Sequence, residues 1–142
     1  MRTLHEAMAT RPELAEPLDD YLASAFAAVD PVVLELCRLR IATLHGDANQ
    51  QRLRTDAAIV AGLDEDKIAA LADHHRASQF TDHERACLAY AEQFVIDVHG
   101  LTDADADRVK DGMTDAEFVA FTVALGLLDG VGRMRLVLDL EA

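Results

Sequence analysis

Helix start signals and stop signals recur along the whole chain and leave little room for any other secondary structure. Asp30-Pro31 places a capping side chain before a proline at the first helical position. Thr81-Asp-His-Glu84 and Thr114-Asp-Ala-Glu117 have the spacing of capping boxes, in which a hydroxyl and a carboxylate satisfy free amides at a helix start. Helix ends are expected at Gly62, Gly100 and Gly112. No clean alternation of apolar and polar residues marks a strand, so we predict an all-α fold.

The apolar residues follow helical spacing and indicate which helix faces are buried. The segment from Pro31 to about Leu44 is expected to form one helix, with apolar residues three and four positions apart on one face. The segment Phe118–Leu128 is apolar nearly all round, which predicts that the domain core or a second subunit encloses it. We expect one all-α domain of about six to eight helices over residues 12–142, preceded by a loosely ordered N-terminal arm at residues 1–11.

Composition excludes several classes of partner. The chain has 142 residues, of which 51% are hydrophobic, and a formal net charge of −13. This length suits one domain that folds without a disulfide or a metal. The acidic balance disfavours nucleic acid and anionic membrane surfaces, because both attract clustered Lys and Arg. We find no signal peptide and no membrane span. Cys37 and Cys87 lie 50 positions apart without a CxxC spacing, so we expect reduced core thiols in a cytoplasmic protein.

The histidines raise the question of a metal site. His74 and His75 could gather with Asp73, His83 and Glu84 around one turn. Side chains of adjacent helical residues point about 100° apart and rarely bind one ion together. We therefore expect no metal site, and no EF-hand spacing indicates calcium.

The most informative stretch, Glu35–Leu63, reads ELCRLRIATLHGDANQQRLRTDAAIVAGL. It is similar to the core of the carboxymuconolactone decarboxylase family, which includes the AhpD-like alkylhydroperoxidases. That family shows Glu-Leu-x-Arg-Leu, an Ala, a Gly followed by Cys-x-x-Cys, a His four residues on, and an Ala-x-x-x-Gly-Leu helix end. The later stretch Phe80–Ala91 resembles the family's F-T-x-x-E-R-A-x-L segment, so the resemblance extends from about Pro12 onward. It implies an AhpD-like helical fold that assembles as a dimer, trimer or hexamer.

The resemblance fails at the residues that carry the family's thiol chemistry. The first family cysteine falls on Asp47, the second on Gln50 and the histidine on Arg54, whereas the glutamate is retained as Glu35. Neither Asp47 nor Gln50 can supply a thiolate, and an arginine stays protonated and cannot relay a proton. We predict that the chain is not a CxxC-dependent alkylhydroperoxidase. A hydroperoxidase that uses Cys37 is the least favoured alternative.

The replacements also have a structural interpretation. Asp47 is expected to cap the next helix, with Gln50 as the reciprocal half of a capping box. Glu35 would be a buried carboxylate that Arg54 or Arg38 neutralises, and we predict the Glu35–Arg54 ion pair.

Four residues make up the candidate site: Glu35, His45, Asp47 and Arg54. His45 is included because it precedes the loop glycine, where it could equally be a turn or helix-end residue. The preferred function is the binding or transformation of a small organic molecule without a cofactor. In a decarboxylase-type lyase, Arg54 would hold a substrate carboxylate while Glu35 or His45 moves a proton. The alternative is a non-catalytic helical homo-oligomer that acts as a scaffold or accessory protein, so whether the chain is an enzyme stays open.

Overall fold

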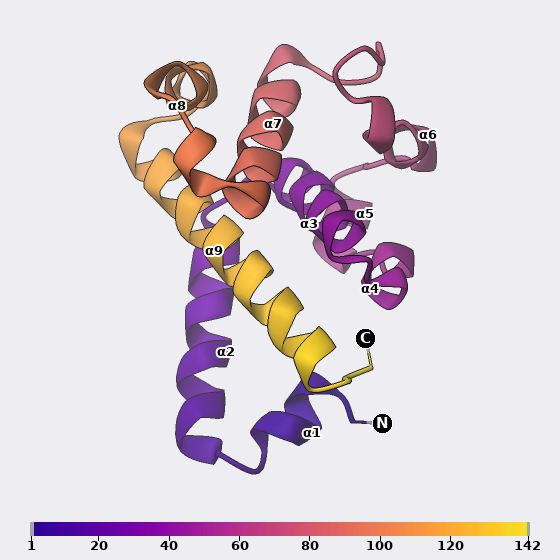
Figure 1. Ribbon diagram of the computed structural model, residues 1–142, viewed down its shortest axis with the longest axis vertical. Coiled ribbons are helices and arrows are strands. Elements are labelled where there is room, and N and C mark those ends of the chain that lie inside the picture. The colour runs from indigo at the N-terminus through magenta and orange to yellow at the C-terminus, as the bar shows by residue number, and fades with distance from the viewer. Residues whose placement is uncertain (1, 142) are drawn as a thin grey trace.

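The computed structural model describes residues 2–141, which form a helical bundle (Figure 1). The α-helices are α1 (Leu4–Met8), α2 (Pro12–Ala27), α3 (Pro31–His45), α4 (Ala48–Arg52), α5 (Asp56–Val60), α6 (Glu65–Ala69), α7 (Asp82–Ile96), α8 (Asp103–Lys110) and α9 (Asp115–Val137), and the 3-10 helices are η1 (Leu71–Asp73) and η2 (Val98–Gly100). The expected all-α fold is confirmed. The described residues contain more helical segments than the six to eight expected, because four of these helices, α1, α4, α5 and α6, have only five residues each.

The helix starts lie where the sequence places them. Asp30 accepts hydrogen bonds from the amides of Val32 and Val33 at 3.0 and 3.1 Å, which fixes the start of α3. Both predicted capping boxes form, at the starts of α7 and α9. Two further boxes, Thr3–Glu6 and Thr102–Asp105, begin α1 and α8.

The core lies where α3 packs against α7 and α9. Leu36 and Cys37 of α3, Leu88 of α7, and Phe121 and Leu125 of α9 are all fully buried. In Figure 1, α9 runs diagonally past α3 and α2 from the α7–α8 end of the molecule to α1. Helix α9 therefore packs against both the core helix α3 and the N-terminal helix α2.

The apolar segment of α9 is enclosed on one face only within this chain. Phe121, Ala124 and Leu125 are buried, but Val119 is 61% exposed. The core therefore encloses the face of α9 that carries Phe121, as expected. Contact of the exposed face with another subunit stays a prediction.

The two ends of the described chain lie side by side. Arg2 and Leu140 form an isolated parallel β-bridge, and the amide of Glu141 donates to the carbonyl of Arg2 at 2.9 Å. Figure 1 shows α1 next to the last turn of α9. Residues 2–11 thus contact the main body, while the domain boundary at residue 12 stays a prediction. No helix among the described residues is long and apolar enough to cross a membrane.

Candidate functional site

Glu35 is a buried carboxylate at the centre of a hydrogen-bond network. It lies on α3 and is 1% exposed. Its Oε1 accepts from Arg38, one helical turn further along α3. Its Oε2 accepts from the amide of Thr55 at 2.5 Å and from the Thr55 hydroxyl at 2.9 Å. Because Thr55 precedes α5, Glu35 ties the start of that helix to α3.

Arg38 completes this network with main-chain acceptors. Its guanidinium donates to the carbonyl of Gln50 at 3.0 Å and to the carbonyl of Leu53 at 2.8 Å. It also donates to the Gln50 side-chain Oε1 at 3.3 Å. The guanidinium therefore neutralises Glu35 and holds the segment that follows α4 in place.

The predicted Glu35–Arg54 ion pair is wrong. Arg38 occupies the position beside Glu35, because residues three apart on one helix lie on the same face. Arg54 instead makes a two-pronged contact with Glu65, with N–O distances of 2.9 and 3.1 Å. The hydrogen bond with Glu65 raises the pKa of Arg54 above its ordinary value. Arg54 thus fixes the α4–α5 segment to α6.

Asp47 caps α4, as the sequence predicts. Its Oδ1 accepts from the amide of Gln50 at 3.1 Å, and the residue is 9% exposed. The reciprocal half of the expected capping box does not form, because the Gln50 side chain faces Arg38. This orientation leaves the Gln50 Nε2 buried without an acceptor among the described residues.

His45 ends α3 and connects it to α9. Its Nε2 lies 2.8 Å from Oδ1 of Asp129, and the same oxygen accepts from Arg133 at 2.9 Å. The imidazole packs on Gly132, where an added Cβ would lie 2.6 Å from the His45 Nδ1. The chain turns after His45 at Gly46, whose φ of 71° favours glycine. His45 is therefore held in one orientation by both helices.

A small cavity of about 130 Å³ lies between α1, α2, α3 and the C-terminal half of α9. Its walls are mainly apolar, and they include Leu4, Leu22, Phe26, Ile41, Leu128 and Val131. Its polar lining residues are Arg38, His45, Asp47, Gln50 and Arg135. Of the four predicted site residues, the structure brings His45 and Asp47 to this cavity. Glu35 and Arg54 are not among the described residues that line it, although Glu35 binds Arg38, which does.

Arg135 is the lining residue that sequence reasoning missed. It lies in the last turn of α9, where a basic residue is expected simply to face solvent. Its guanidinium donates to the carbonyl of Glu141 at 3.3 Å, and no carboxylate of the described residues lies within 4.0 Å of it. Burial lowers the pKa of Arg135 below its ordinary value, while the charge of Asp47 opposes this shift. The cavity thus contains a half-buried cation without a close counter-ion in the part of the chain that the structure describes.

The two cysteines lie in the core, as expected. Both are buried, and the Cys37 Sγ lies 3.9 Å from the carbonyl of Cys87. Burial raises the pKa of Cys37 well above its ordinary value and that of Cys87 to about 12. Neither thiol has the lowered pKa that a peroxidatic thiolate requires.

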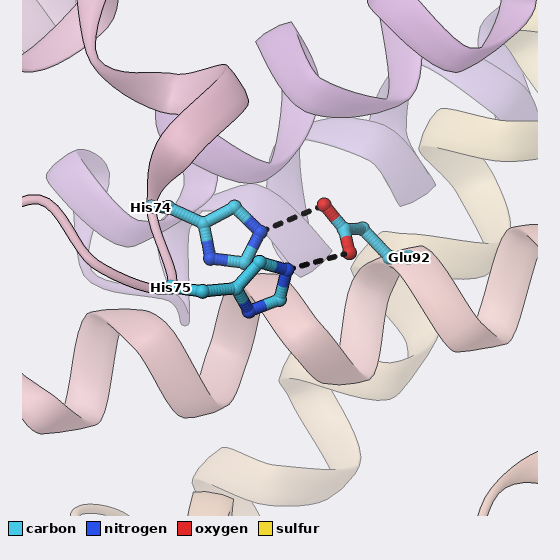
Figure 2. Close-up of side chains that lie close together, drawn as sticks. All are labelled: His74, His75 and Glu92. Atoms are coloured by element: carbon cyan, nitrogen blue, oxygen red, sulfur yellow. Dashed lines mark hydrogen bonds and ion pairs between the residues drawn. The ribbon is translucent and has the colours of Figure 1, made fainter.

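The histidine cluster differs from the one considered from the sequence. Glu84 binds Lys67 at 2.9 Å and completes the capping box of α7, while His83 lies beside the sulfur of Cys87. His74 and His75 converge instead on Glu92 of α7 (Figure 2). Adjacent histidines meet one carboxylate here because they lie in a turn after η1 and not within a regular helix.

Fold and site together define an all-helical protein with a small apolar cavity and no reactive thiol in its described part. Residues 12–93 match the model of the carboxymuconolactone decarboxylase family, and the chain belongs to this family. Its fold is AhpD-like. A crystal structure from Agrobacterium tumefaciens, of a protein of unknown function for which an antioxidant-defence role as AhpD has been suggested, is similar with a TM-score of 0.76. The two sequences are 22% identical, and the match covers 95% of this chain and 94% of that one. Among curated proteins, no sequence matches the chain.

Proposed function

We propose that the cavity binds a small, largely apolar organic molecule that carries a carboxylate, and that this site works without thiol redox chemistry. The observation that carries the proposal is Arg135, a half-buried guanidinium that lines an apolar cavity and lacks a close counter-ion among the described residues. A ligand carboxylate would supply the missing partner, and bonds to a charged group contribute more than neutral ones.

The size of the cavity restricts the ligand. An apolar cavity of about 150 Å³ in another protein accommodates benzene. The cavity here, of about 130 Å³, therefore suits a single ring or a chain of about six carbons. Leu22, Phe26 and Ile41 would pack against this apolar body.

The polar end of the cavity supports a single anionic group. Arg38 is already committed to Glu35 and to main-chain carbonyls, so it offers no free charge. Asp47 repels a second anionic group and could accept a hydrogen bond from a ligand hydroxyl. The buried Nε2 of Gln50 is a further donor without an acceptor among the described residues. Arg135 is therefore the residue on which ligand binding should depend most.

A decarboxylase-type reaction is the second candidate, and the His45–Asp129 pair favours it. Loss of carbon dioxide from a bound carboxylate breaks one carbon–carbon bond and leaves an electron pair that must take up a proton. His45 lines the cavity and is held by Asp129 at 2.8 Å, so it is placed to donate that proton. Arg135 would then have the substrate-holding role that we predicted for Arg54 from the sequence.

Titration calorimetry with four small probes tests the binding proposal. Benzoate and hexanoate should bind, whereas benzamide and hexan-1-ol, which have similar shapes but no charge, should bind about tenfold more weakly or not at all. Arg135→Met should weaken benzoate binding by about tenfold or more. Arg108→Met removes an exposed cation of α8 and is the matched control. Equal binding of benzoate and benzamide, or unchanged binding by Arg135→Met, would contradict the proposal.

We also propose that the chain forms a homo-oligomer. Exposed apolar residues at the end of α9 favour this, because Leu136, Val137 and Leu138 are 47%, 83% and 47% exposed. Light scattering at micromolar concentration should give a mass above that of one chain, and Val137→Asp should lower it. Val60→Asp changes a valine of α5 that is 88% exposed and serves as the control. A wild-type mass equal to one chain would refute the proposal.

A further inference from the structure

We propose that His74, His75 and Glu92 form a zinc-binding site on the side of α3 that faces α7. This site is separate from the cavity, and it does not depend on the proposed function. Two imidazoles and one carboxylate are a ligand set that zinc uses, with a water molecule at the fourth position.

The three ligand atoms already lie close together. The His74 Nε2 is 2.7 Å from Glu92 Oε1, and the His75 Nε2 is 3.8 Å from Glu92 Oε2. One atom from each residue can be chosen so that all three lie within 4.8 Å of one another. A tetrahedral zinc ion with bonds of about 2.0–2.2 Å separates its ligands by roughly 3.3–3.6 Å. Small rotations of these side chains would produce that spacing, and Figure 2 shows both rings directed at the carboxylate.

The turn that carries the histidines is fixed by α7. Arg85 donates to the carbonyl of His74 at 3.2 Å and to the carbonyl of Ala77 at 2.6 Å. The centroids of the two imidazole rings are 3.9 Å apart, with a tilt of 41°. Both ligands are therefore held near their binding positions before an ion arrives, which lowers the entropy that binding must overcome.

Arg40 binds the same oxygen of Glu92 as His74 does and helps to orient the carboxylate. The Nε of Arg40 lies 2.6 Å from Glu92 Oε1. A zinc ion bound to Glu92 Oε2 would leave this bond intact, and carboxylates that bind metals are commonly held by a second hydrogen bond. The Arg40 charge opposes a cation, whereas the Glu92 carboxylate and the chain's net charge of −13 favour one.

The exposure of the three side chains indicates the side from which a zinc ion would enter. The side chain of His74 is 0% exposed, that of Glu92 is 15% exposed and that of His75 is 63% exposed. An ion would approach past His75, where solvent can supply the fourth ligand. Binding through the His74 Nε2 moves the ring proton to Nδ1, which is buried and has no acceptor among the described residues. Because a missing outer partner weakens metal binding by about 10–100-fold, we expect micromolar affinity and not the tighter binding of a closed structural site.

Titration of the whole chain with zinc and with cobalt tests this site. Calorimetry at neutral pH should give one zinc ion per chain, and bound cobalt should show the visible absorption of a tetrahedral site. His75→Ala should weaken zinc binding at least tenfold. The fold should survive this substitution because the side chain of His75 is exposed. His99→Ala removes an exposed histidine elsewhere and should bind zinc as the wild type does.

A second measurement separates ligation from general surface binding. Zinc should raise the melting temperature of the wild type and of His99→Ala, but not that of His75→Ala. No zinc uptake at millimolar concentration, or equal uptake by wild type and His75→Ala, would overturn the proposal. Uptake that His99→Ala abolishes would overturn it as well.

Discussion

Arg38 and Arg40 leave the same helix two residues apart, and each binds a carboxylate that the fold covers. Their side chains point to nearly opposite sides of α3, because residues two apart on a helix lie on opposite faces. Arg38 bonds Glu35 and two main-chain carbonyls. Arg40 bonds Glu92, whose other side-chain partners among the described residues are His74 and His75.

The hydrogen-bond networks of Arg38 and Arg40 differ in the kind of partner that each arginine binds. Main-chain acceptors cannot move without moving the backbone, so the Arg38 network fixes the path of the chain from α4 to α5. The Arg40 network consists of side chains, which can exchange one partner for another while the helices stay in place. The first network is thus a structural clamp, and the second is suited to taking up an ion.

The largest effect should come from removing the carboxylate of the clamp. Glu35→Gln leaves the Arg38 guanidinium without its counter-ion, and breaking such a buried pair costs about 3–5 kcal/mol of unfolding free energy. Urea unfolding measures this loss. Glu65→Gln, which removes the exposed partner of Arg54, is the control and should change stability little. A double-mutant cycle should couple Glu35 to Arg38 and not to Arg54, and the reverse result would restore the ion pair that we rejected.

The side-chain network should respond less strongly. Glu92→Gln removes the charge that Arg40 and His74 share, for which we expect a loss of about 1.5–3 kcal/mol in urea unfolding. The loss is smaller than for Glu35 because Gln keeps an acceptor and nearby side chains can rearrange. A loss equal to that of Glu35→Gln would remove the distinction between the two networks.

Acidic pH should weaken the contribution of Glu92 to the stability of the folded state. Burial raises the pKa of Glu92, but hydrogen bonds from His74 and Arg40 outweigh this and lower it overall. Its charged form therefore stabilises the folded state above the pKa of an unfolded glutamate, and this stabilisation disappears as the pH falls through the lower folded value. The stability difference between wild type and Glu92→Gln should be constant near neutral pH and shrink below about pH 4.5. A difference that grows on acidification would contradict this assignment.

The smallest of these effects should come from the helix cap beside the clamp. Asp47→Ala removes the acceptor for the amide of Gln50 and should cost about 0.5–2 kcal/mol. Asp47→Asn keeps a capping oxygen and should stay close to the wild type. If both variants lose equal stability, the carboxylate charge of Asp47 matters more than its role as a cap.

The fold was predictable because its signals are local. Asp30, Thr81 and Thr114 each cap a helix through a residue at most three positions away, so the sequence pattern contains the whole interaction. The capping box at Thr102 was missed because aspartate takes the place of glutamate. The family resemblance added the arrangement of these helices, which local spacing does not determine.

The candidate site was predictable only in part. The cap at Asp47 and the position of His45 follow from spacing next to Gly46. Arg38 was considered as a partner of Glu35, but the pattern alone could not rank it above Arg54. Glu92 meets Arg40 across 52 residues, and Arg135 reaches a cavity whose other walls come largely from the first 50 residues. One sequence contains no signal for such tertiary contacts.

The bridge between Arg2 and Leu140 implies an order of mechanical failure. A force that pulls these two ends apart acts first on this bridge, with its backbone hydrogen bond from Glu141 to Arg2. Its rupture would peel α1 away and carry Leu4 out of the cavity wall, while α3 and α7 still bear no load. Under tension, this protein would open its cavity well before its core gives way.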